Sequence, residues 1–182
     1  MKKIFLIILL IFFKTNLAHS LIEVDITRGN LDPLPIAVSP LHVDPKSDII
    51  KEIKVKELGE DISSIVEKNF KSTGLFNPLQ KESFVQKPDI AHLKPRFEDW
   101  NLIKAQALIT GKVLIKDNKL KVEFRLWDLT ASKEMLALAF TTTPTNWRRV
   151  AHIISDKIYE RLTGEKGYFD TRIIYVAESG PK

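Results

Sequence analysis

Three histidines beyond the first twenty residues are the first candidates for metal binding or acid–base chemistry. His42, His92 and His152 lie far apart along the chain, and none has a second histidine or a carboxylate at zinc-motif spacing. His152 neighbours an apolar stripe typical of a helix, so a place on a helix surface is the simpler interpretation. The chain has no cysteine, which excludes disulfides, thiolate metal sites, cysteine nucleophiles and the acylated cysteine of a lipoprotein leader. We expect no metal site.

The motifs of phosphate binding and nucleophilic catalysis fail on inspection. Thr110-Gly111-Lys112 is similar to the end of a phosphate loop, but Gln106 replaces the required glycine and Val113 replaces the magnesium-binding Ser/Thr. Five serines lack the flanking glycines of a nucleophile elbow: Ser39, Ser47, Ser63, Ser64 and Ser155. We therefore expect no catalysis and no cofactor.

Two pairs of like charges have structural interpretations. Glu98-Asp99 precedes a predicted helical turn, where acidic residues favour the helix dipole. Arg148-Arg149 opens a predicted helix, and it is either a solvated face or a docking patch for an acidic partner. Neither pair requires a catalytic role.

The first twenty residues predict export. Lys2 and Lys3 precede an apolar run of ten residues, Ile4 to Phe13, and Ala18 and Ser20 are small residues before a cut after Ser20. A membrane span needs roughly 20 apolar residues, so the run is too short for one. Residues 1–20 are therefore predicted to be a cleaved signal peptide and the mature chain to be periplasmic, with an uncleaved anchor or a neighbouring cut as alternatives.

The charge of the mature chain is small. The leader carries three lysines and no acidic residue, which lowers the formal net charge from +5 to +2. Lysine and glutamate are interspersed, without the basic stripe and interleaved aromatics of a nucleic-acid binder. We expect no nucleic-acid partner.

Apolar periodicity predicts an α/β domain over residues 21–166. Two long helices are predicted, from Leu58 to Gly74 and from Trp147 to Gly164, the second capped by Asn146. Gly59 is expected to weaken the first by about 1 kcal/mol. A short helical turn at 97–104 carries Trp100. Strands are predicted at residues 21–30, 36–38, 83–86, 105–116, 119–128 and 134–142. This order predicts a mixed sheet packed by two long helices.

The end of the chain has the pattern of a further strand. Phe169–Ala177 is rich in β-branched and aromatic residues, and Glu-Ser-Gly-Pro-Lys follows it. Either this strand pairs with an earlier one, or it begins another domain. We favour the second interpretation because an unpaired apolar edge is a liability.

The stretch from Tyr159 to Val176, YERLTGEKGYFDTRIIYV, resembles the junction between the two domains of the TolB family, the periplasmic component of the Tol–Pal system. Further similar segments lie along essentially the whole mature chain: Pro35-Ile36-Ala37-Val38, Gly74-Leu75-Phe76-Asn77-Pro78-Leu79, Trp147-Arg148, Ala151-His152 and Ser155-Asp156. The resemblance implies an N-terminal α/β domain with a five-stranded mixed sheet, similar to anticodon-binding domains, followed by a six-bladed β-propeller. Residues 167–182 then look like the linker and first strand of a propeller that is otherwise missing, as in a truncated or split reading frame or a fragment.

The resemblance also implies partners. In the family, the start of the mature protein binds the C-terminal domain of TolA, and contacts with the lipoprotein Pal lie mainly on the propeller. A TolA-like partner is therefore expected at the N-terminal arm, residues 21–30, and a Pal-like partner only where a propeller is supplied. The partner-binding residues are expected to be Leu21, Ile22, Glu23, Val24, Asp25 and Ile26.

The residues of the arm agree with such a role. Their alternation of apolar and acidic side chains suits an extended segment that adds itself to a partner's sheet edge. The alternative is that the arm pairs within its own sheet. The primary hypothesis is thus a non-enzymatic Tol–Pal adaptor, for which no small-molecule substrate is expected. The other hypotheses are a secreted small-molecule-binding α/β module and a secreted hydrolase.

Overall fold

In the computed structural model, residues 22, 24, 32–51 and 53–171 are described. The predicted signal peptide, most of the predicted arm and residues 172–182 lie outside this part. Within it, six strands form one mixed sheet, with the order β3-β1-β4-β5-β6 and the short β2 paired to β4. The strands are β1 (Leu34–Val38), β2 (His42–Val43), β3 (Phe76–Pro78), β4 (Ala107–Lys116), β5 (Lys119–Asp128) and β6 (Lys133–Thr142).

Parallel and antiparallel pairing divide the sheet. β1 pairs in parallel with β3 and β4, and β2 also pairs in parallel with β4. β4, β5 and β6 form the predicted antiparallel meander. Asp117 and Asn118 turn between β4 and β5 with φ of 50° and 55°, the left-handed geometry of a tight hairpin. The mixed α/β fold with two long helices is confirmed.

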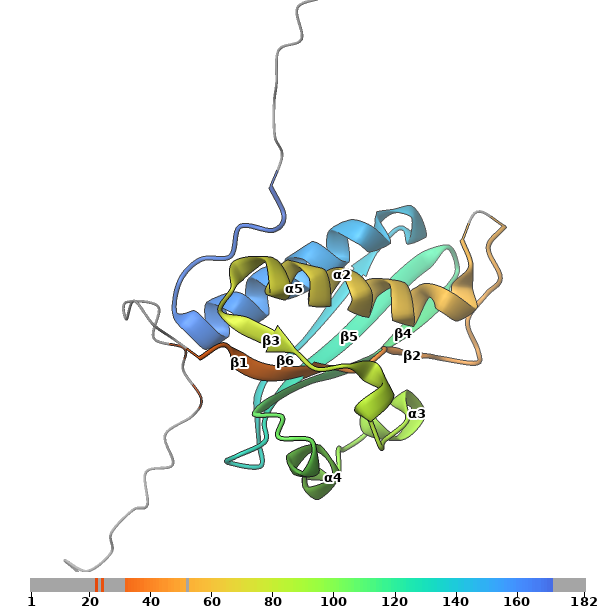
Figure 1. Cartoon of the computed structure of the whole chain (residues 1–182). Coiled ribbons are helices and arrows are strands. Elements are labelled where there is room, and N and C mark those ends of the chain that lie inside the picture. Colours follow the sequence, from red (N-terminus) through yellow and green to blue (C-terminus); the bar gives the residue numbers. More distant parts are fainter. Residues whose placement is uncertain (1–21, 23, 25–31, 52, 172–182) are drawn as a thin grey trace, which may run out of the picture.

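Helices cover both faces of the sheet (Figure 1). The two long helices, α2 (Leu58–Thr73) and α5 (Trp147–Thr163), lie side by side on one face. The short helices α3 (Pro88–Ala91) and α4 (Phe97–Leu102) lie on the other side. The 3₁₀ turns are η1 (Val55–Glu57), η2 (Lys81–Ser83) and η3 (Pro144–Asn146).

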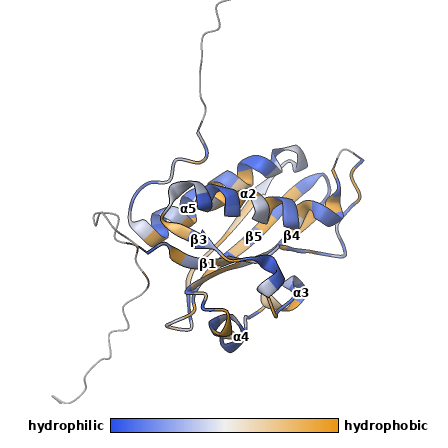
Figure 2. Ribbon diagram, viewed as in Figure 1, coloured by the Kyte–Doolittle hydropathy of each residue, from blue (hydrophilic) through white to orange (hydrophobic). Residues whose placement is uncertain are grey.

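The larger core lies between the sheet and the two long helices. Blue and orange alternate along α2 in Figure 2, as expected of a helix with one buried face. That face contributes Ile62, Val66 and Phe70, which are at most 2% exposed. A smaller cluster around Trp100 and Leu108 lies on the opposite face, under α3 and α4. The sheet therefore separates two hydrophobic cores of unequal size and contributes side chains to both.

Gly59 does more than weaken a helix. A Cβ at this position would lie 1.9 Å from the carbonyl oxygen of Leu41, and the Leu41 amide donates to the Gly59 carbonyl at 3.2 Å. The first turn of α2 thus contacts the backbone after β1 directly, which only glycine permits. The glycine lowers the stability of the helix, but the helix could not pack this closely against the backbone beside the sheet without it.

Two local predictions were wrong. Residues 83–86 form no strand; Gln86 is buried there, and its side-chain Oε1 accepts bonds from the Trp100 indole and the Arg96 amide. Asn146 occupies the N-cap position of α5, but its side chain bonds Thr142 and Thr143 and caps nothing. Residues 169–171 of the last predicted strand form no strand, and its remaining residues, 172–177, lie outside the described part of the chain.

Candidate functional site

The N-terminal arm is described at two residues, Ile22 and Val24, and both contact the domain. The Ile22 amide donates to Asp128 Oδ2 at 2.9 Å, and the Val24 amide donates to the Leu162 carbonyl at 2.7 Å. Both side chains are partly buried against the larger core. Leu21, Glu23, Asp25 and Ile26, the other predicted partner-binding residues, lie outside the described part of the chain.

Asp128 and Leu162 can hold the arm because each has an oxygen atom that needs a hydrogen-bond donor. Asp128 is fully buried at the end of β5, and its other carboxylate oxygen accepts the Ala131 amide at 2.8 Å. A buried carboxylate needs such donors. Leu162 lies in the last turn of α5, where carbonyl groups lack partners within the helix. The arm therefore satisfies two acceptors that the domain leaves available at one end of the sheet.

Sequence reasoning did not identify these two acceptors. An aspartate after a strand and a leucine before a helix-ending glycine carry no recognisable signal, because their role depends on contacts across more than a hundred residues. Ile22 and Val24 do not pair with a strand of the sheet either, which was the alternative interpretation of the arm. One of them bonds a side chain and the other bonds a helix end.

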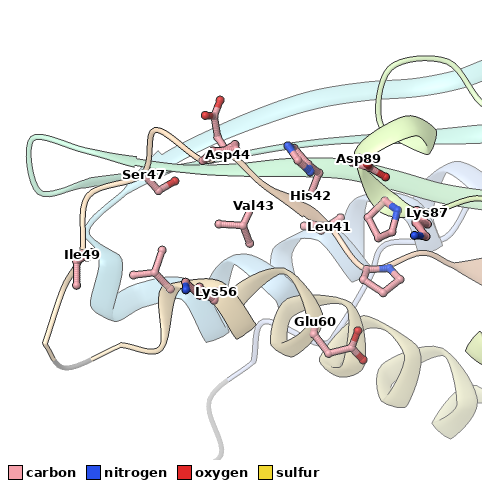
Figure 3. A pocket seen from close by; sticks show the side chains of 14 residues that line it. Leu41, His42, Val43, Asp44, Ser47, Ile49, Lys56, Glu60, Lys87 and Asp89 are labelled. Atoms are coloured by element: carbon pink, nitrogen blue, oxygen red, sulfur yellow. The ribbon is translucent and has the colours of Figure 1, made fainter.

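A hollow of about 640 Å³ lies between the segment after β1, the start of α2 and α3 (Figure 3). Leu41 and Val43 contribute apolar surface, with Val43 directed towards α2. The charged side chains around it are mixed in sign: His42, Asp44, Lys56, Glu60, Lys87 and Asp89. The volume is within the range of small-ligand sites, roughly 300–1,000 Å³.

His42, at this hollow, stacks on His92. Their ring centroids are 4.4 Å apart and the planes differ by 7°. Burial, and then the proximity of His92, lowers the pKa of His42, although Asp44 and Asp89 oppose this shift. The histidines are thus distant in sequence but adjacent in space, because β2 pairs with β4 while α3 contacts the same strand.

The remaining candidates have structural roles. His152 lies on the side of α5 that contacts α2, where its Nδ1 is 3.1 Å from the Asn69 side-chain nitrogen. Arg148 stacks on Trp147 at 4.4 Å, and Arg149 pairs with Asp170 at 3.2 Å. Among the described residues, no group of three or more histidine, aspartate or glutamate side chains could hold a metal ion. No helix in that same part of the chain is long and apolar enough to cross a membrane.

This combination of a mixed sheet, two long helices and an N-terminal arm attached at the sheet's end defines a single α/β domain with a peripheral peptide segment. The TolB amino-terminal domain family matches residues 22–135, and the chain belongs to this family.

Two known proteins illustrate the relationship. The chain is 65% identical over 184 aligned residues to the Tol-Pal system protein TolB of Pelagibacter ubique (strain HTCC1062), covering all of this chain and 41% of the relative. TolB from Acinetobacter baumannii, solved by crystallography, matches the fold with a TM-score of 0.61 and 21% identity, covering 76% of this chain and 30% of the other. The chain thus spans less than half the length of the proteins that it resembles.

Proposed function

We propose that this domain is a periplasmic, non-enzymatic adaptor of the Tol–Pal system, acting through protein contacts in outer-membrane integrity and in invagination during cell division. The observation that carries the proposal is its 65% identity to a Tol-Pal system protein over the whole chain. A leader with the pattern of a signal peptide supports the compartment. A Pal-like contact is not proposed for this domain, because in the family it lies mainly on the propeller.

The proposed binding segment is residues 21–26, which would pair through backbone groups with a sheet edge of a TolA-like inner-membrane protein. The attachment of the arm to its own domain supports this. One hydrogen bond to the Asp128 carboxylate, one to the Leu162 carbonyl, and the partial burial of both side chains hold Ile22 and Val24. The bond to the Leu162 carbonyl contributes about 0.5–1.5 kcal/mol and the bond to the Asp128 carboxylate about 1.5–3 kcal/mol, so a partner whose strand edge offers several backbone hydrogen bonds can compete for the arm.

The test is a calorimetric titration of the chain with the C-terminal domain of a TolA-like protein. Deleting residues 21–26 is expected to lower the affinity at least about tenfold, the equivalent of 1.4 kcal/mol. A matched variant, Asp128→Asn, weakens the arm's own attachment without altering the arm, and it is expected to raise the affinity. Unchanged affinity in the deletion would contradict the proposal.

The second candidate, a small-molecule-binding module, is favoured by the hollow of about 640 Å³ beside His42. A specific ligand for the folded state must raise the melting temperature. Thermal-shift screening with metabolites, repeated on Val43→Arg to fill the hollow, separates this function from the adaptor. A shift that Val43→Arg abolishes would support it.

A further inference from the structure

The two edges of the sheet differ in what they offer to another chain. β3, at one edge, has three residues and ends in Pro78, which lacks a backbone donor. β6, at the other, has ten residues, none of them fully buried. Within the described part of the chain, β6 pairs on one side only, with β5. A long edge strand of this kind is a template for β-strand addition.

A hollow accompanies the β6 edge. It has a volume of about 420 Å³, and it lies between Leu136 of β6 and the C-terminal half of α5, where Lys157, Glu160, Arg161 and Gly164 line it. Beyond Leu136 on the same face of β6, the Leu138 side chain is 37% exposed. A strand added to β6 would therefore find an apolar surface for its side chains next to the backbone groups that it pairs with. We call this surface the β6–α5 groove.

Arg161 gives the groove its chemical preference. A register shift in the β5–β6 pairing leaves Met135 unpaired, and Arg161 Nε donates to the Met135 carbonyl at 3.3 Å. Among the described residues, no carboxylate forms an ion pair with the half-buried Arg161. Lys157, by contrast, is paired with Glu160 at 2.9 Å. The guanidinium group retains donors that match a carboxylate.

From these observations, we propose that the β6–α5 groove accepts an extended segment of another protein in which apolar and acidic residues alternate. The backbone of the segment pairs with β6, its apolar side chains lie over Leu136 and Leu138, and a carboxylate binds Arg161. This surface is separate from residues 21–26, so the inference does not depend on the adaptor's arm.

A second copy of this chain fits the groove less well. β6 carries one acidic residue, Glu134, which already pairs with Arg125 at 3.2 Å. Pairing between two β6 strands would therefore supply no free carboxylate from β6 to Arg161. It would also place two identical cationic grooves near each other, which is unfavourable.

The test uses a blocked hexapeptide that alternates valine and glutamate, titrated into the isotope-labelled chain and followed by NMR. The largest amide shifts are expected at residues 136–140 and at the Arg161 side chain. Arg161→Met is expected to weaken peptide binding at least about tenfold. Arg161→Lys should lower the affinity less, because the positive charge remains. Arg148→Met, which removes a cation at the far end of α5, is the matched control and should bind normally.

Other outcomes overturn the inference. These are the absence of shifts at millimolar peptide, shifts centred on Ile22 and Val24, equal binding of a valine–lysine peptide, and self-association through β6 that the peptide does not reverse. Leu138→Lys provides a second variant at an exposed position, and it should block binding without unfolding the chain. Peptide binding should persist when residues 21–26 are deleted, which separates this result from the test of the adaptor.

Discussion

Near both ends of the domain, an aspartate accepts backbone amides of the described residues, but Asp128 is buried and Asp156 is partly exposed. On the N-terminal side, buried Asp128 accepts the Ile22 amide at 2.9 Å. On the C-terminal side, Asp156 of α5 accepts two amides, from Phe169 at 2.7 Å and from Asp170 at 3.1 Å. In each case an aspartate satisfies backbone donors of residues that, within the described part of the chain, belong to no strand of the sheet.

The described part of the C-terminal segment also makes aromatic and ion-pair contacts. The Phe169 ring lies edge-on to Phe70 and Tyr159, with centroids 6.3 Å and 5.8 Å away. The Arg149 guanidinium pairs with Asp170, and Gly167 lies directly against the backbone of Asp156. If the arm binds a partner as proposed, we expect residues 167–171 to remain fixed on the helices.

The largest expected effect comes from removing the C-terminal acceptor. Asp156→Ala breaks two hydrogen bonds to a charged group and should lower the free energy of unfolding by about 2 kcal/mol, since such bonds contribute roughly 1.5–3 kcal/mol when buried and this carboxylate is partly exposed. Urea unfolding of the full chain, followed by circular dichroism, measures the loss. Asp156→Asn keeps one acceptor oxygen and should lose about half as much. No measurable loss in Asp156→Ala would contradict a role for this carboxylate in holding the C-terminal segment.

Gly167→Ala tests the same attachment sterically. The added Cβ would lie 2.4 Å from the Asp156 Cα, so the segment must move away from α5. We expect a loss of about 1.5 kcal/mol, within the range for overpacked sites. Combined with Asp156→Ala, the loss should be much less than additive, because both changes release one segment. Lys166→Ala, at an exposed neighbour, is the control, and additive losses would show that the two residues act separately.

Asp128→Asn tests the N-terminal attachment. It should lower the free energy of unfolding by about 1 kcal/mol, because the side-chain amide keeps one acceptor oxygen while the hydrogen bond at the other position is lost. The Ile22 amide should exchange with solvent faster, as measured by hydrogen exchange. Asp128 also holds the Ala131 amide, so the same substitution in a chain lacking residues 21–26 isolates the share that belongs to the arm. If the loss is equal in both backgrounds, the arm contributes nothing to it.

The elements of this fold were more predictable than its contacts. The meander, its Asp117-Asn118 turn and the ends of α2 and α5 follow from alternation, from residues that tolerate positive φ and from Gly74 and Gly164, which adopt φ of 71° and 75°. β2 and β3 were missed because two or three residues are too short to show a period. Their pairing depends on the neighbouring strands β1 and β4 rather than on their own sequence.

The site was only partly predictable, for a related reason. The alternation of residues 21–26 identified the arm, but Asp128 and Asp156 are single aspartates whose partners lie 106 and 13 or 14 residues away. No local sequence pattern distinguishes an aspartate that accepts such bonds from an aspartate that is exposed to solvent. Likewise, the His42–His92 stack and the Arg161 guanidinium beside β6 depend on the packing of elements whose order alone does not fix their distances.

The smallest expected effect concerns the ion pair of the C-terminal segment. Arg149 lies at the surface, and its pair with Asp170 spans 3.2 Å in contact with solvent. Exposed pairs contribute little, so Arg149→Ala should change the free energy of unfolding by no more than about 0.5 kcal/mol, and less at high salt. The measurement is urea unfolding at two ionic strengths, with Arg148→Ala as the neighbouring control. A loss approaching that of Asp156→Ala would show that charge, rather than the backbone bonds to Asp156 and the burial of Phe169, keeps this segment on the helices.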